Sequence, residues 1–119
     1  MVNPKIEVCA NSAASCVAAE QGGGGRVELC AGIPEGGTTP SYGEMVTARR
    51  AIGIQLNVII RPRGGDFLYT PAEVQTMLLD IEAAKAAGAD GAVFGCLGAD
   101  GTVGVETNAR LKQAAGGLS

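Results

Sequence analysis

The chain has 119 residues, an apolar content of 46% and a formal net charge of −3, a composition typical of one globular domain with its own core. Because it has no basic stripe with interleaved aromatic residues, the sequence does not predict a nucleic-acid partner. No apolar run approaches the roughly 20 residues that cross a bilayer, and the N-terminus is too short and polar for a signal peptide, so the expected location is cytoplasmic.

Short strand-like runs alternate with longer helix-like runs, which predicts four strand–helix pairs. In chain order, the pairs are expected at residues 5–10 and 12–21, 26–31 and 41–52, 55–61 and 70–87, and 91–96 and 105–115. Two helix starts have the spacing of a capping box, Ser41 with Glu44 and Thr70 with Glu73. Pro71 also occupies the first helical position after Thr70, where proline is favoured.

Repeated strand–helix pairs predict a parallel sheet in one domain spanning residues 1–119, either an open doubly wound sheet or part of a closed barrel. A doubly wound sheet buries both faces of its strands, whereas these strands alternate apolar and polar positions. The polar face carries Glu7 with Cys9, Glu28 with Cys30, and Asn57 with Arg61. This alternation favours a barrel with a polar interior, so we predict an α/β fold, a parallel (βα)4 half of a (β/α)8 TIM-type barrel.

Five motifs resemble the successive motifs of the CutC copper-homeostasis family. They are EVCANS at 7–12, RVELC at 26–30, EGGTTPS at 35–41, IRPRGGDFLY at 60–69 and GADGAVFG at 88–95. The resemblance implies a TIM-type barrel, a cytoplasmic location and a role tied to copper. Because CutC chains continue into a second half, whose first strand bears a His-Arg motif and would follow Ser119, we expect a fragment or an engineered half-barrel.

A half-barrel leaves the inner face and the edge strands of its sheet open to solvent. Two copies related by a two-fold axis would supply eight strands and close the barrel. We therefore predict a homodimer or a higher oligomer. The alternative is a rearranged, flavodoxin-like sheet in which a helix covers the inner face.

Glu7 and Glu28 are the candidate catalytic residues, because they occupy matching places on neighbouring strands, which lie roughly 4.8 Å apart. Two close carboxylates can separate their pKa values and act as acid and base. The structural alternative is that they form ion pairs with Arg26, Arg61 or Lys5. Since the chain has no histidine, acid–base chemistry would depend on groups of this kind.

The loop after the third predicted strand is the candidate anion-binding site. It contains Arg61, Arg63, Gly64, Gly65 and Asp66 and lies at the mouth of the barrel, where TIM barrels place their sites. Glycines let backbone N–H groups approach a ligand, and arginine can hold a carboxylate or phosphate through two parallel hydrogen bonds. The alternative is a rigid turn in which Asp66 pairs with an arginine.

Four cysteines match no zinc-binding spacing and are expected to be free thiols. Cys9 and Cys30 each follow a glutamate by two residues on the same face of adjacent strands, so their sulfurs could bind one Cu(I) ion, which prefers thiolate ligands. Cys96 lies a strand or more away, and Cys16 lies on a helix. The alternative for the pair is simple packing, because a buried cysteine behaves as a small hydrophobic residue.

Two functional hypotheses follow. The first is a self-assembling half-barrel related to the CutC family that binds Cu(I) through inward cysteines. The second is part of a TIM-barrel enzyme acting on a small anionic substrate, with Glu7 and Glu28 as acid and base and Arg61 and Arg63 as clamps. We expect no enzymatic activity from the half-length chain alone, and no cofactor other than copper.

Overall fold

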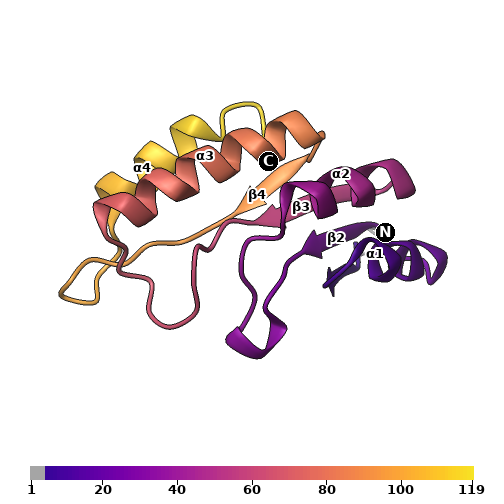
Figure 1. Cartoon of the computed structure of the whole chain (residues 1–119), viewed down its shortest axis with the longest axis horizontal. Helices are drawn as coiled ribbons and strands as arrows, with labels where there is room; N and C mark the ends of the chain where they lie inside the picture. The colour runs from indigo at the N-terminus through magenta and orange to yellow at the C-terminus, as the bar shows by residue number, and fades with distance from the viewer. Residues whose placement is uncertain (1–4) are drawn as a thin grey trace.

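The computed structural model describes residues 5–119, in which strands and helices alternate along the chain (Figure 1). The strands are β1 (Glu7–Ala10), β2 (Arg26–Leu29), β3 (Gln55–Ile59) and β4 (Gly91–Val93). The helices are α1 (Ala13–Gln21), α2 (Tyr42–Ala51), α3 (Pro71–Ala87) and α4 (Val105–Ala114), and a short 3-10 helix, η1 (Ile33–Glu35), lies between β2 and α2. None of the helices in this part of the chain is both long and apolar enough to cross a membrane.

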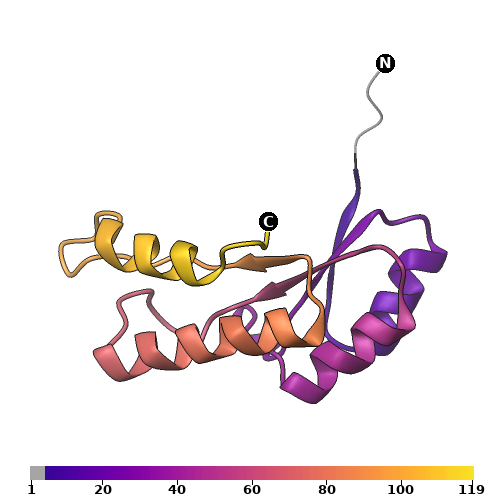
Figure 2. The same cartoon turned by 90° about the horizontal axis from the view of Figure 1, so that it is seen from above.

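All four strands are parallel and lie in the order β1-β2-β3-β4, so each strand–helix unit adds the next strand at the same edge. Successive helices contact one another in the same order, and Figure 2 shows α1, α2 and α3 following one another along one side of the twisted sheet. Leu29, Leu56 and Val58 of the strands are fully buried in one core with Met45 and Met77 of the helices. Burial of each such side chain stabilises the fold by about 1.5–3 kcal/mol.

The two predicted capping boxes differ in the structure. At the start of α3, the Thr70 hydroxyl accepts a hydrogen bond from the Glu73 backbone N–H, and the Glu73 carboxylate accepts one from the Thr70 N–H. Ser41 caps α2 in the same way, but the Glu44 carboxylate accepts a hydrogen bond of 2.7 Å from the Ala13 N–H instead. The reciprocal half of that predicted box is therefore wrong, because a free N–H in the first turn of α1 competes for the carboxylate.

The face of the sheet opposite the helices, here called the inner face, carries Glu7, Cys9, Glu28, Asn57 and Ile59. Glu7 and Cys9 are exposed, and the other three are half-buried, whereas the alternate strand residues face the core. Within residues 5–119 no helix lies over this face, so the flavodoxin-like rearrangement does not occur in the described part of the chain. The sheet therefore has one apolar side under the helices and one polar side.

The two edges of the sheet have different surroundings. Along β4, the Ser119 backbone N–H donates to the Asp90 carbonyl at 2.8 Å, and the Ser119 carbonyl accepts from the Ala92 N–H at 3.2 Å. In the described residues β1 forms ladder pairs with β2 alone. Its outer edge therefore presents backbone groups that another strand could bind.

Candidate functional site

Three loops lie together at one end of the molecule, where the carboxyl ends of the parallel strands meet (Figure 1). They are the β2–α2 loop (30–41), the β3–α3 loop (60–70) and the β4–α4 loop (94–104). Parallel α/β sheets commonly bind their ligands at this end. The predicted site residues lie either in these loops or on the inner face beside them.

On the inner face, Glu7 forms an ion pair with Arg26, with 2.5 Å between Oε2 and Nε. This contact is one of the ion pairs that the sequence analysis gave as the structural alternative. The register pairs Glu7 with Arg26 and Cys9 with Glu28, so the expected matching of the two glutamates is wrong by two residues. The connection through α1 sets the register of β1 against β2, so two similar strand motifs need not lie side by side.

The Glu7 carboxylate nevertheless lies close enough to Glu28 to change its pKa. Burial raises the pKa of Glu28, the neighbouring Glu7 carboxylate raises it further, and Arg26 acts in the opposite direction. Glu28 therefore holds its proton more readily than an ordinary glutamate does, as a general acid must. A catalytic role for Glu7 and Glu28 stays a prediction.

The sulfur atoms of Cys9 and Cys30 lie 3.3 Å apart, although the two residues are not register partners. Cys9 is exposed on the inner face, whereas Cys30 is buried and its thiol approaches the Ala10 carbonyl at 3.6 Å. Burial, and after it the adjacent Cys9 thiol, raises the pKa of Cys30 to about 12. Cys30 is therefore a neutral thiol at neutral pH, with its neighbour reachable from solvent.

The other two cysteines lie in the hydrophobic core. Cys16 on α1 is fully buried, and Cys96 after β4 is almost so. Burial raises the pKa of the Cys16 thiol and that of the Cys96 thiol. Across residues 5–119, no three His, Cys, Asp or Glu side chains gather to hold a metal ion. The pair Cys9 and Cys30 therefore offers two ligands of these types.

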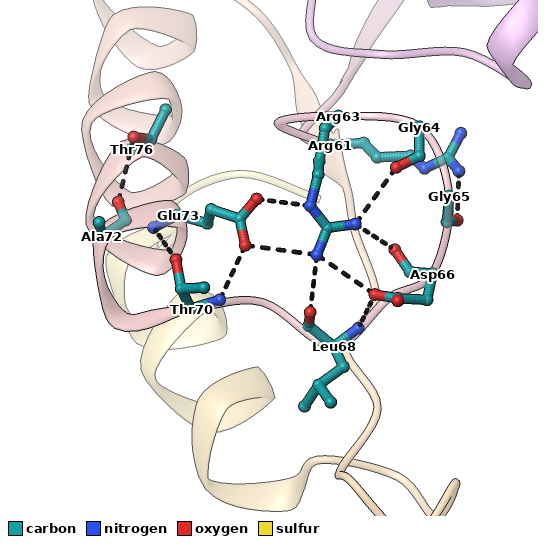
Figure 3. A network of polar contacts seen from close by, with 10 residues as sticks. All are labelled: Arg61, Arg63, Gly64, Gly65, Asp66, Leu68, Thr70, Ala72, Glu73 and Thr76. Atoms are coloured by element: carbon teal, nitrogen blue, oxygen red, sulfur yellow. Dashed lines mark hydrogen bonds and ion pairs between the residues drawn. The ribbon is translucent and has the colours of Figure 1, made fainter.

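Arg63 is the centre of a hydrogen-bonded network that shapes the β3–α3 loop (Figure 3). Its guanidinium forms ion pairs with Glu73 at the start of α3 and with Asp66 in the loop, at 2.5 and 3.2 Å. It also donates hydrogen bonds to the backbone carbonyls of Gly64, Asp66 and Leu68. These contacts describe the rigid turn that was the structural alternative to anion binding, so the donors of Arg63 are occupied within the fold.

The two glycines of the loop allow this turn. Gly65 has a φ of 85°, in the left-handed region that favours glycine. A Cβ on Gly64 would lie 3.0 Å from the Cβ of Glu35 in η1, so the β3–α3 loop packs closely on the β2–α2 loop. Their role in anion binding stays a prediction.

Arg61 is 9% exposed and joins the two loops. Its Nη1 donates to the carbonyls of Glu35 and Gly37 at 2.7 and 3.1 Å, and its Nη2 donates to the Gly65 carbonyl at 2.9 Å. The guanidinium carbon lies 4.9 Å from the centre of the Phe67 ring. No carboxylate of the described residues lies within ion-pair distance of this guanidinium.

Tyr69 is a residue of this end of the molecule that the sequence analysis did not single out. Its ring lies 5.1 Å from the Arg63 guanidinium, and its hydroxyl is buried with no hydrogen-bond partner in the described chain. Burial raises the pKa of Tyr69. The available signal was the placement of Phe67 and Tyr69 directly after the glycine loop, in a chain with only two phenylalanines and two tyrosines.

Comparisons with known proteins agree with the motifs. The model of the CutC family matches residues 4–119. A family protein CutC from Bacteroides fragilis is 61% identical over 120 residues, covering 100% of this chain and 48% of the relative. A copper homeostasis protein cutC homolog from Mus musculus is 54% identical over 98 residues, covering 82% of this chain and 36% of the relative. The chain thus spans about half the length, or less, of these curated relatives.

Solved structures give the same picture. The crystal structure of a copper homeostasis protein CutC from Streptococcus agalactiae matches with a TM-score of 0.88 at 36% identity, covering 94% of this chain and 55% of that one. A phosphonomutase-like structure from Burkholderia cenocepacia J2315 matches with a TM-score of 0.63 at 16% identity, covering 93% of this chain and 46% of that one. The second likeness concerns the fold alone.

Four parallel strand–helix units that cover about half of a TIM-type barrel define the class of this protein, and the predicted α/β half-barrel fold is confirmed. With the family model matching nearly its whole length, the chain belongs to the CutC family.

Proposed function

We propose that the chain takes part in copper homeostasis by binding Cu(I) through Cys9 and Cys30. The observation that supports this most directly is the 3.3 Å separation of their sulfur atoms at the carboxyl end of β1 and β2. Thiolates are soft ligands that suit Cu(I), which accepts few ligands. The name of the mouse relative, a copper homeostasis protein cutC homolog, points the same way.

Cu(I) must displace the proton of the buried thiol, because the thiolate is the form that binds metal. With the pKa of Cys30 at about 12, this proton is present throughout the neutral range. The apparent Cu(I) affinity is therefore expected to rise as the pH rises from 6 to 8.

A Cu(I) titration under oxygen-free conditions, in competition with a chromophoric Cu(I) chelator, tests the proposal. The parent chain should remove Cu(I) from the chelator, and Cys9→Ser and Cys30→Ser should each abolish this competition. Cys96→Ala, which removes a thiol from the core, is the matched control and should keep the parent stoichiometry. Unchanged stoichiometry in both serine variants would reject the thiolate pair as the copper site.

We also propose that a second copy of the chain covers the inner face. Glu7 and Cys9 are exposed there, and the outer edge of β1 is open within the described residues. Two four-stranded sheets related by a two-fold axis would bury these groups in an eight-stranded barrel. Analytical ultracentrifugation should then give twice the mass of the chain, and a sole monomer at micromolar concentration would refute self-association.

Acid–base chemistry on a small anionic substrate is the second candidate. It is favoured by the raised pKa of Glu28, which is due to burial and to the Glu7 carboxylate beside it. In this role Glu28 would donate a proton and Glu7 would accept one. Carbon-13 NMR of the Glu28 carboxyl group tests the arrangement, because Glu28 should titrate above the ordinary glutamate value of 4.5 and should move back toward it in Glu7→Gln. Titration of Glu28 at the ordinary value in the parent chain would remove the basis for this chemistry.

A further inference from the structure

A small cavity lies at the carboxyl ends of β3 and β4, beneath the β3–α3 loop. Its volume is about 130 Å³. It is lined by Ile59, Ile60, Arg61, Phe67, Tyr69, Val93, Phe94 and Gly95. At about 30 Å³ of liquid volume for each water molecule, this space equals that of roughly four waters. This volume suits a ligand group of a few heavy atoms.

Two buried polar atoms of residues that line the cavity have no hydrogen-bond partner in the described chain. They are Nε of Arg61 and the hydroxyl oxygen of Tyr69. A buried donor without a partner destabilises a protein by about 1–3 kcal/mol, so such atoms are rare unless a ligand or water completes them. They belong to two of the residues that line the cavity, and both can donate to the same acceptor group.

The charge of Arg61 is also uncompensated. Its other two nitrogens donate to the carbonyls of Glu35, Gly37 and Gly65, which are neutral groups. No ion pair joins Arg61 to a carboxylate within residues 5–119. A guanidinium that is 9% exposed is expected to have a negative partner, because an unpaired charge is costly to bury.

We propose that this cavity binds a short-chain monocarboxylate, with its carboxylate at Arg61 Nε and the Tyr69 hydroxyl and its alkyl group against the apolar lining. A carboxylate needs few donors and brings an apolar group that matches Phe94, Val93 and Ile60. Phosphate has more oxygen atoms to satisfy and no apolar part, so this lining fits it poorly. Burial raises the pKa of the Tyr69 hydroxyl, which keeps its proton for donation, and the adjacent Arg61 guanidinium lowers this pKa in part, so the two groups lie close together.

The inference is independent of copper binding, since the cysteine pair lies on β1 and β2. A monocarboxylate is one class of the small anions considered for the enzymatic alternative, and here it binds at the Arg61–Tyr69 cavity rather than at Arg63. A binding measurement without turnover therefore separates its failure from failure of the proposed functions.

Nitrogen-15 NMR of the arginine side chains tests the proposal with propionate as the probe. The Arg61 Nε–H signal should shift in a saturable manner, and the Arg63 Nε–H signal should not, because Glu73 already occupies that donor. Neutral propionamide and inorganic phosphate should leave both signals in place at the same concentration.

Two tyrosine variants decide whether the cavity is the site. Tyr69→Phe keeps the ring and removes the hydroxyl, so it should weaken propionate binding about tenfold through loss of a hydrogen bond to a charged group. Tyr42→Phe, at an exposed tyrosine of α2, should bind like the parent. The proposal is overturned if propionate does not shift Arg61, if phosphate or propionamide shifts it equally, or if Tyr69→Phe binds propionate as the parent does.

Discussion

The β3–α3 loop and the inner face at β1 and β2 lie on the same sheet, but each has a glutamate whose pKa is shifted in the opposite direction. In the loop, hydrogen bonds from Arg63 and then from the Thr70 backbone hold the pKa of Glu73 below its usual range. On the inner face, burial and the like charge of Glu7 raise the pKa of Glu28. Paired opposite charges stabilise a turn, whereas crowded like charges are more typical of sites that bind or react.

The same contrast separates two arginines that lie two positions apart. Arg63 forms ion pairs with the carboxylates of Glu73 and Asp66. Arg61 instead donates to backbone carbonyls, lines a cavity, and has an Nε without a hydrogen-bond partner in the described chain. The donors of Arg63 are therefore all used to hold the loop, whereas Arg61 both holds the loop and keeps an Nε without a hydrogen-bond partner among residues 5–119. The following variants test this division, in order of expected effect.

Arg61→Ala should have the largest effect on stability. It removes the three hydrogen bonds that Arg61 donates across two loops, and the free energy of unfolding should fall by about 3 kcal/mol. Arg61→Lys should recover only part of this loss, because an ammonium group cannot reproduce the planar set of donors. Urea unfolding measures both variants. Arg50→Ala, at an exposed arginine of α2, is the control, and an equal change there would contradict the bridging role.

Glu73→Gln should have an intermediate effect that depends on pH. The variant keeps an oxygen for the Thr70 N–H but loses the charge that pairs with Arg63. Because the folded pKa of Glu73 is lowered, its contribution to stability is present above the ordinary value of 4.5 and is lost as the pH falls through the folded value. The parent should therefore be more stable at pH 7, and the difference should vanish in acid. Glu82→Gln, at an exposed position of α3, is the control, and a pH-independent difference at Glu73 would refute the pairing.

Glu28→Gln should have the smallest effect, with the opposite sign. The folded pKa of Glu28 is raised, so its charged form penalises folding as the pH rises from 4.5 through the folded value. The variant should be slightly more stable than the parent at pH 7 and equal to it below 4.5. Thermal unfolding across this pH range measures the difference. A variant that is less stable at pH 7 would show that Glu28, like Glu73, serves as a matched structural charge.

Much of the fold was predictable because its signals are local. The apolar alternation in strands, the Thr70–Glu73 capping box and the runs of helix-forming residues each depend on neighbours a few positions apart. The hydrogen bond that the Glu44 carboxylate accepts from the Ala13 N–H, in place of the Ser41 N–H, was not predictable. Ala13 lies 31 positions away in the sequence and on a different helix. Competition between distant polar groups is decided only when the helices pack.

The sequence by itself determined that this chain forms four parallel strand–helix units with a polar inner face, and its motifs identified the CutC family. Only the tertiary structure decided the register that offsets Glu7 from Glu28 by two residues and the 3.3 Å approach of the Cys9 and Cys30 sulfurs. It also decided which hydrogen bonds Arg61 and Arg63 each form. The physical reason is that side-chain type and strand period follow from local sequence, whereas stagger, loop path and choice of hydrogen-bond partner depend on how distant segments pack.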